Sequence, residues 1–278
     1  MGGIKLELNP LGQTIAHIVC VLLCIVIIVP MMLVLGTSFK PYNEIFSPLP
    51  WPTQPTFENY LRILQNSDFQ KFLLNSTATT LYRVIGQILI CIATAYAFAR
   101  FEFRGKNFLF ILVLAAMMIP PQLTMIPNYI LIANLGWFDT WTGLVVPNLA
   151  MPFGVFLLRQ HMLGFPKEFF DAAEIDGASE LEKLWYVVLP NLRPAIAALT
   201  IIVFIESWNE YFWPLLISET TASETLQIGL RRFMNEDMGD EYGLLTAGVT
   251  LVSLPALAIF FFFQRQVLET FVSSGLKG

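Results

Sequence analysis

The sequence contains 278 residues, of which 55% are hydrophobic and only 13% are charged, and its mean hydropathy is +0.62. This composition excludes a soluble globular domain and indicates a protein that crosses a membrane several times. The net charge of −5 identifies no class of partner, because in a membrane protein the position of each charge relative to the spans matters more than the sum.

A helix that crosses a membrane needs ~20 predominantly apolar residues. Several segments have this character, so we expect an all-α membrane protein with six transmembrane helices, at residues 14–39, 73–99, 108–135, 141–158, 195–216 and 244–263. Pro120, Pro121 and Pro127 should break the third helix. That helix should pack inside a bundle, because neighbouring helices or water must satisfy the backbone groups that the prolines free.

The other segments are more polar: a tail at 1–13, a proline-rich loop at 40–71, a charged loop at 164–193 and a second tail at 266–278. Six spans put both termini on one side of the membrane. With the termini inside the cell, internal segments hold ten Lys and Arg residues and external loops hold five, which fits the positive-inside rule. We therefore expect both termini and the 164–193 loop in the cytoplasm, and the 40–71 loop outside.

The loop at 164–193 has the most specific pattern in the chain. Four residues recur at i, i+3, i+4 and i+7 and so share one face of a short helix: Phe169, Ala172, Ala173 and Asp176. Gly177 is placed to end this helix in a left-handed conformation. Ser179 and Glu182 predict a capping box that opens a second short helix, which Pro190 should end.

This loop resembles the EAA loop of the permease subunits of binding-protein-dependent ABC importers. The residues that carry the resemblance are Asp171, Ala172, Ala173, Asp176, Gly177, Ala178, Leu189 and Pro190. The family usually has Glu where this chain has Asp171, which keeps the charge and shortens the side chain by one methylene. The resemblance implies that the loop is a coupling helix, and that these residues dock into a groove of a cytoplasmic ATPase.

The likeness extends over residues 72–265, which it identifies as an ABC transmembrane domain with the type-I importer permease fold. Four further stretches resemble the carbohydrate-uptake branch, in particular its shorter maltose-type or glycerol-3-phosphate-type permease: residues 37–41, 57–60, 208–214 and 275–278. In maltose-type systems the C-terminal tail reaches the ATPase. The resemblance therefore implies an ATPase contact through Gly275, Lys277 and Gly278.

The resemblance also implies the assembly and its location. The chain would lie in the bacterial plasma (inner) membrane with a second related permease, two ATPase subunits, an external substrate-binding protein and a small-molecule solute. ATP and magnesium would be bound by the partner ATPase, so we expect no cofactor in this chain, no catalytic residue and no nucleic-acid partner. The sequence is consistent with this expectation of no cofactor and no catalytic residue. It contains no G-x-x-x-x-G-K-[ST] phosphate loop, no hydrolase or metalloprotease motif, and no Cys/His metal cluster.

The fifth expected span carries a polar stripe. Its members fall at i, i+3, i+4 and i+7: Glu206, Asn209, Glu210 and Trp213. A carboxylate at membrane depth costs ~2.5–3.5 kcal/mol, so these side chains should face a cavity or a partner. In one interpretation the stripe lines the transport path, with carboxylates that accept hydrogen bonds from substrate hydroxyls and Trp213 stacked on a sugar ring. In the other, the carboxylates only bind neighbouring helices near Pro214.

Three alternatives stay open. A phosphate-bearing solute such as glycerol-3-phosphate or a glycerophosphodiester should meet Arg or Lys. The spans contain only Arg83 beside two acidic residues, which favours a neutral sugar or polyol. An ion-coupled secondary transporter would use Glu206 and Glu210 as ion sites, but it would leave the charged loop unexplained. An intramembrane enzyme would need a catalytic constellation that the sequence lacks.

Overall fold

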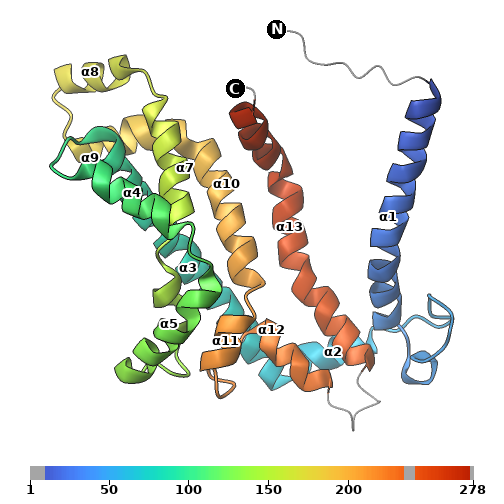
Figure 1. The fold of residues 1–278 in the computed structure, drawn as a ribbon. Helices are drawn as coiled ribbons and strands as arrows, with labels where there is room; N and C mark the ends of the chain where they lie inside the picture. Colours follow the sequence, from blue (N-terminus) through green and yellow to red (C-terminus); the bar gives the residue numbers. More distant parts are fainter. Residues whose placement is uncertain (1–9, 235–241, 276–278) are drawn as a thin grey trace. The chain divides into compact units, whose positions relative to one another are not determined.

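The computed structural model describes residues 10–234 and 242–275, and every regular element within them is a helix (Figure 1). The chain divides into two compact units, Met1–Asn66 with Arg232–Leu251, and Ser67–Arg231 with Val252–Gly278. Four described helices are long and apolar enough to cross a membrane, and two bent helix pairs bring the total to six if each pair makes one span. The expected all-helical membrane fold is therefore confirmed.

The first unit joins the first helix to the polar segment that follows it. Helix α1 covers Pro10–Ser38 and runs through Pro30 as one helix, and the short helices η1 (Tyr42–Glu44) and α2 (Glu58–Gln65) come after it. The segment at 40–71 is therefore not a plain loop, because it contains two short helices and the start of the next long one.

Two stretches that carried the family resemblance, residues 37–41 and 57–60, lie against each other in this unit. The side-chain amide of Asn59 donates to the carbonyl oxygen of Ser38 at 3.0 Å, and the Tyr60 hydroxyl lies 2.6 Å from Ser38 Oγ. These contacts attach α2 to the end of α1. Because an asparagine amide can satisfy carbonyl groups that a helix end leaves without partners, the two stretches have a shared structural role.

The second unit begins with α3, Ser67–Arg100, which starts six residues before the expected residue 73. The third expected span is two helices, α4 (Lys106–Ala116) and α5 (Pro121–Leu135), bent by 99° at the break between them. Helix α5 runs through Pro127, so only the Pro120–Pro121 pair breaks this segment.

Most side chains of α4 and α5 are exposed in the single chain, so its own helices do not surround the third span. Packing of this span inside a bundle stays a prediction for the assembly. Pro121 is the first residue of α5, where a proline removes an N–H that has no partner inside the helix in any case. Pro127 lies inside α5 and leaves the carbonyl oxygen of Leu123 without its helical donor.

The fourth span is also bent, by 47°. It consists of α6 (Trp141–Val145), η2 (Val146–Asn148) and α7 (Pro152–Leu163), so it extends five residues beyond the expected end at 158. After α7 the charged loop forms α8 (Lys167–Ile175), which Figure 1 shows beyond the end of α7, and then α9 (Glu180–Glu182).

Pro190 does not end the second short helix, contrary to the sequence prediction. A π-helical segment, η3 (Lys183–Val188), joins α9 to α10 (Leu189–Trp208) without interruption. A proline in an α-helix clashes with the carbonyl group four residues earlier, here that of Tyr186. That carbonyl lies in the wider π-helical turn, so the chain passes Pro190 as helix.

The fifth expected span, 195–216, is broken instead after Trp208, and α11 covers Phe212–Ile217. Pro214 explains the position of the break. In a continuous helix its ring would clash with the carbonyl group of Glu210, and it offers no N–H to that carbonyl. The chain leaves the helical path at Asn209 and Glu210.

The remaining described elements are α12 (Leu226–Gly229), η4 (Leu230–Met234) and α13 (Tyr242–Gly275). The sixth expected span, 244–263, lies within α13. Helix α13 also continues through most of the expected C-terminal tail at 266–278, as far as Gly275.

The core of the second unit lies where α3, α7 and α10 pack together. Its central side chains include Cys91 of α3, Leu158 of α7 and Leu199 of α10, all fully buried. Gly154 permits this close approach. A Cβ atom at this position would lie 2.6 Å from Cys91 Sγ and 3.1 Å from a methyl carbon of Leu199.

Asp139, in the turn between α5 and α6, fixes the segment that follows α11. Its carboxylate accepts hydrogen bonds from the backbone N–H groups of Glu219 and Thr220, both at 3.1 Å, and from the Ser223 hydroxyl at 2.6 Å. Its own backbone N–H donates to the carbonyl oxygen of Ile217 at 2.9 Å. Burial acts to raise the pKa of Asp139, but these hydrogen bonds outweigh burial and hold the pKa below its ordinary value.

The packing at Gly154 generates a first prediction. We expect Gly154→Val to destabilise the fold by about 1–3 kcal/mol, because the core has no room for the added atoms. Thermal unfolding of the purified protein in detergent measures this effect. Ala93→Val, on the exposed face of α3, is the control and should leave the unfolding temperature nearly unchanged. Equal unfolding temperatures for the two variants would contradict the packing argument.

The pKa of Asp139 generates a second prediction. Because the folded pKa is lowered, the stabilisation is present above the ordinary pKa of about 3.9 and is lost as the pH falls through the folded value. Acidification should therefore release the amide protons of Glu219 and Thr220, which hydrogen exchange corrected for intrinsic rates measures. Asp139→Asn should lack this pH dependence. If the variant kept it, another group would be responsible.

Candidate functional site

A polar cavity of about 530 Å³ lies within the second unit. The polar side chains that line it are Arg83, Gln87, Thr124, Asn128, Asn148, Glu206, Asn209, Glu210 and Tyr211. Such a concentration of amide, hydroxyl and charged groups among apolar helices is unusual, because each group is costly to remove from water without a partner. The cavity is thus the strongest candidate for a binding site or a path through this unit.

The three breaks in the apolar segments all border this cavity. The α4–α5 break supplies Pro121, and the α10–α11 break supplies residues 209–212. The α6–α7 break supplies Pro147, Asn148, Ala150 and Met151. Backbone outside a helix is tolerated within a membrane only where protein buries it or where it faces water. The proline-associated breaks and the cavity therefore lie together because the non-helical backbone at the breaks must be buried by protein or face water.

The expected polar stripe does not exist as one helix face. Glu206 lies in the last turn of α10, Asn209 caps that helix, and Glu210 lies in the break. The cavity nevertheless brings these three side chains together, because the chain turns where the helix ends. The Trp213 side chain does not line the cavity, although its backbone N–H, at the start of α11, donates to Glu210 Oε1 at 3.3 Å.

Trp213 cannot offer its ring to a sugar in this structure, contrary to one sequence interpretation. The residue is 4% exposed, and its indole N–H donates to the carbonyl oxygen of Gly143 at 3.0 Å. Its ring packs instead with Ile132, Leu144 and Ile217. Trp213 therefore holds α11 against α5 and α6 and supports the cavity wall from behind.

Arg83 and Gln87 of α3 form a wall of the cavity, and the sequence did not predict that they belong to this site. The closest charged atoms, Arg83 Nη1 and Glu210 Oε2, are 3.9 Å apart, and Arg83 Nε is buried without a hydrogen-bond partner. Gln87 donates to the backbone carbonyl of Asn148, which leaves its own buried Oε1 without a partner. Arg83 was visible in the sequence as the single cation of the spans, but nothing along the chain connects it to Glu210.

The turn after α8 and the start of α9 have the local geometry that the sequence predicts. Helix α8 ends with Gly177 in a left-handed conformation, φ +77°, and two hydrogen bonds close the turn: Ala178 N–H to Ala173 O at 2.9 Å, and Gly177 N–H to Glu174 O at 3.1 Å. This pair of bonds is a Schellman motif. Ser179 and Glu182 form the predicted capping box at the start of α9.

The residues assigned to ATPase coupling fall on three elements. Asp171, Ala172 and Ala173 lie on α8, and residues 176–178 form the turn after it. Leu189 and Pro190 begin the long helix α10, not the end of a short one. Of the expected C-terminal contacts, Gly275 is the last residue of α13, while Lys277 and Gly278 lie outside the described residues.

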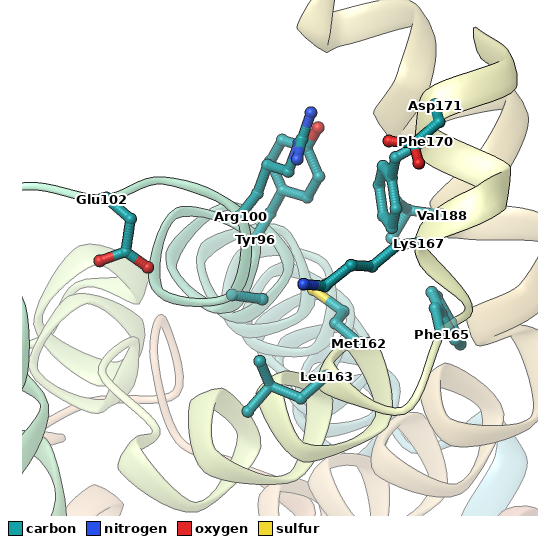
Figure 2. Close-up of a pocket in the computed structure, with 11 residues that line it drawn as sticks. Tyr96, Arg100, Glu102, Met162, Leu163, Phe165, Lys167, Phe170, Asp171 and Val188 are labelled. Carbon is teal, nitrogen blue, oxygen red and sulfur yellow. The ribbon is translucent and has the colours of Figure 1, made fainter. Parts of the chain in front are cut away.

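A second, smaller cavity of about 350 Å³ lies under α8 (Figure 2). Figure 2 shows Lys167 and Phe170 of α8 on one side, with Tyr96 and Arg100 at the end of α3 on the other. Within residues 10–234 and 242–275, three or more His, Cys, Asp or Glu side chains do not gather into a group that could hold a metal ion.

Comparison with known proteins identifies the family. Residues 87–269 match the family model described as "binding-protein-dependent transport system inner membrane component". The chain belongs to this family. The permease is 30% identical over 279 residues to the arabinooligosaccharides transport system permease protein AraQ of Halalkalibacterium halodurans, which covers 99% of this chain and 100% of the relative. This result decides against the ion-coupled secondary transporter.

Other relatives and a solved structure agree. The permease is 32% identical over 265 residues to the diacetylchitobiose uptake system permease protein NgcG of Streptomyces coelicolor, 94% of this chain and 87% of the relative. It is 28% identical over 280 residues to the sn-glycerol-3-phosphate transport system permease protein UgpE of Rhizobium meliloti, 97% and 99% of the two chains. A chain of a bacterial ABC transporter involved in alginate import superposes with a TM-score of 0.83, over 93% of this chain and 98% of that chain at 21% identity, which supports the type-I permease fold.

The Schellman turn of the permease generates a third prediction. A valine at Gly177 would have to adopt a left-handed conformation that costs a side chain ~1–2 kcal/mol. We expect Gly177→Val to raise hydrogen exchange of the α8 amides by about 5- to 30-fold, measured on the purified protein. Gly177→Asn is the control, because asparagine tolerates this conformation. Equal exchange in the two variants would show that the turn does not limit α8.

Proposed function

We propose that the permease forms half of the path through which an ATP-driven importer moves a neutral oligosaccharide or related polyol. The cavity lined by Arg83, Glu206, Asn209 and Glu210 is the observation that carries this proposal. Its carboxylates and amides suit solute hydroxyl groups, since both accept hydrogen bonds from O–H donors. The named sugars of the relatives, arabinooligosaccharides and diacetylchitobiose, support the same class of solute.

The charge of the cavity favours a neutral solute over a phosphate ester. Its single guanidinium, that of Arg83, faces two carboxylates, and the closer of them belongs to Glu210. A phosphate would have to compete with these carboxylates for the one cation. The glycerol-3-phosphate transport named for UgpE is the second candidate, and the unpartnered Arg83 Nε is the observation that favours it.

The α8 segment is the proposed contact with a separate ATPase that binds ATP and magnesium, so that this chain supplies no catalytic group. None of the α8 residues is buried, and two large apolar side chains of the charged segment stay exposed, Ile175 at the end of α8 at 87% and Leu181 of α9 at 66%. Exposed apolar groups of this size on a charged segment are typical of a protein interface. The small residues Ala172 and Ala173 keep this helix slim enough to enter a groove.

The proposed assembly contains this chain, a second related permease, two ATPase subunits and an external substrate-binding protein. Both termini and α8 would face the cytoplasm, which the distribution of Lys and Arg residues supports. A solved structure of the alginate transporter in complex with an alginate pentasaccharide-bound periplasmic protein also supports the binding-protein partner.

Uptake measurements test the path assignment. We expect Glu210→Gln to lower the maximal rate of arabinotriose uptake by about tenfold in proteoliposomes that hold the full assembly, because a hydrogen bond to a charged group contributes ~1.5 kcal/mol. Glu219→Gln, which removes a carboxylate outside the cavity, is the matched control and should keep the normal rate. ATP hydrolysis measured in parallel shows that both assemblies are intact.

Two outcomes would overturn parts of this proposal. If Glu210→Gln and Asn209→Ala both left arabinotriose uptake unchanged, the cavity would not be the path. If wild-type assemblies took up glycerol-3-phosphate and not arabinotriose, the second candidate would replace the first.

A further inference from the structure

Four charged side chains near the end of α3 form a closed ring. Arg100 lies 3.4 Å from Glu174 and 3.8 Å from Glu180, measured between nitrogen and carboxylate oxygen. Lys183 lies 3.5 Å from Glu174 and 2.9 Å from Glu180. Each cation therefore contacts both carboxylates, and each carboxylate contacts both cations. We call these four residues the charge ring.

The charge ring connects four helical elements. Arg100 is the last residue of α3, Glu174 lies on α8, Glu180 opens α9, and Lys183 opens η3, which continues into α10. The Tyr96 hydroxyl of α3 adds a hydrogen bond of 2.7 Å to Glu180. The Lys183 side chain is only 6% exposed, so its charge depends on the two carboxylates for compensation.

Helix α8 has no fully buried residue, and it is held by the charge ring together with Phe170, which packs against the core of the second unit. Its principal contacts with α3 are Glu174 in the charge ring and Phe170, whose ring centroid lies 5.1 Å from the Arg100 guanidinium carbon. The cavity of about 350 Å³ under α8 leaves space between these contacts and the core (Figure 2). A helix held in this way can shift as a body while the ring keeps it attached.

The two long helices that meet the ring also line the transport cavity, α3 near its middle and α10 near its C-terminal end. On α3, Arg100 lies 17 residues after Arg83, a distance of about 25 Å at 1.5 Å per residue. On α10, the helix that follows Lys183 carries Glu206. A displacement of α8 is therefore applied to both walls of the cavity through rigid helices.

We propose that the charge ring is the joint through which movement of α8 reaches the cavity, with Arg100, Glu174, Glu180 and Lys183 as positioning residues. This inference rests on the proposed function, because it assumes that an ATPase moves α8. The Glu174 side chain is 66% exposed, so a role in transmitting movement can be tested separately from a role in stabilising the fold. Exposed ion pairs contribute little to stability, so neutralising Glu174 should leave the fold intact and still open the ring.

A cysteine reporter in the cavity wall tests the joint without any solute. Ala150 lines the cavity and is exposed to it, so Ala150→Cys gives a thiol whose reaction rate with a membrane-impermeant maleimide follows opening and closing. Cys20, Cys24 and Cys91 are replaced by Ala in this background. The rate is measured in the full assembly with and without ATP and vanadate, and ATP hydrolysis is measured in parallel.

With the ring intact, we expect nucleotide to change the labelling rate by about fivefold or more, the lower end of typical coupling between two sites. Glu174→Gln and Lys183→Met should each reduce this change to less than about twofold while ATP hydrolysis continues. The double variant should be no worse than either single one, because both open the same ring. Glu102→Gln removes an exposed carboxylate that pairs only with Lys106 among the ion pairs at this end of α3, and it should behave as wild type.

The outcomes separate the two proposals. If the Ala150→Cys thiol reacts at the same rate with and without nucleotide in the intact assembly, the transport cavity itself is misassigned. If nucleotide changes the rate equally in the wild-type ring, Glu174→Gln and Lys183→Met, the charge ring is not the joint. If Glu102→Gln abolishes the response as well, the effect is one of general charge at this surface and the proposal fails.

Discussion

The structure of this permease depends on one constraint, which is that backbone polar groups in an apolar segment must find partners. Its prolines prevent continuous helices in three segments, and the chain meets the constraint by placing all three breaks around one polar cavity. Pro214 illustrates the mechanism, because its ring excludes a helical carbonyl at Glu210 and so places that residue in the break. The same proline thereby gives the cavity one of its two carboxylates.

The unbroken helix α3 has the opposite role. It packs against α7 and α10 in the core, faces the cavity with Arg83 and Gln87, and ends at the charge ring with Arg100. A continuous helix transmits displacement along its axis with little loss, whereas a break absorbs it. The permease thus combines continuous helices with broken segments, and both contribute polar side chains to the cavity.

The π-helical segment η3 has a related consequence. It lets the chain pass Pro190 as helix, so the charged segment and the fifth span form one continuous element from Glu180 to Trp208. Had Pro190 ended a short helix, as the sequence predicts, a non-helical connection would join α9 to α10. The continuity instead joins Lys183 of the charge ring directly to Glu206 of the cavity.

The sequence by itself determined what depends on neighbouring residues. The apolar segments, the Schellman turn at Gly177 and the capping box at Ser179 follow from local conformational preference and from hydrogen bonds within a few residues. The EAA-like pattern at 171–190 likewise identified the family, because a family pattern is a property of the sequence. These features form in the same way in many tertiary surroundings.

Only the tertiary structure decided which distant side chains meet. It paired Arg83 with Glu210, removed Trp213 from the cavity by burying it, and closed a ring between Arg100 and residues 174–183. Helical periodicity failed for the polar stripe because it assumes an unbroken helix, and Pro214 broke it. Contacts between residues more than 70 positions apart depend on how helices pack, and a pattern of spacing along the chain contains no such information.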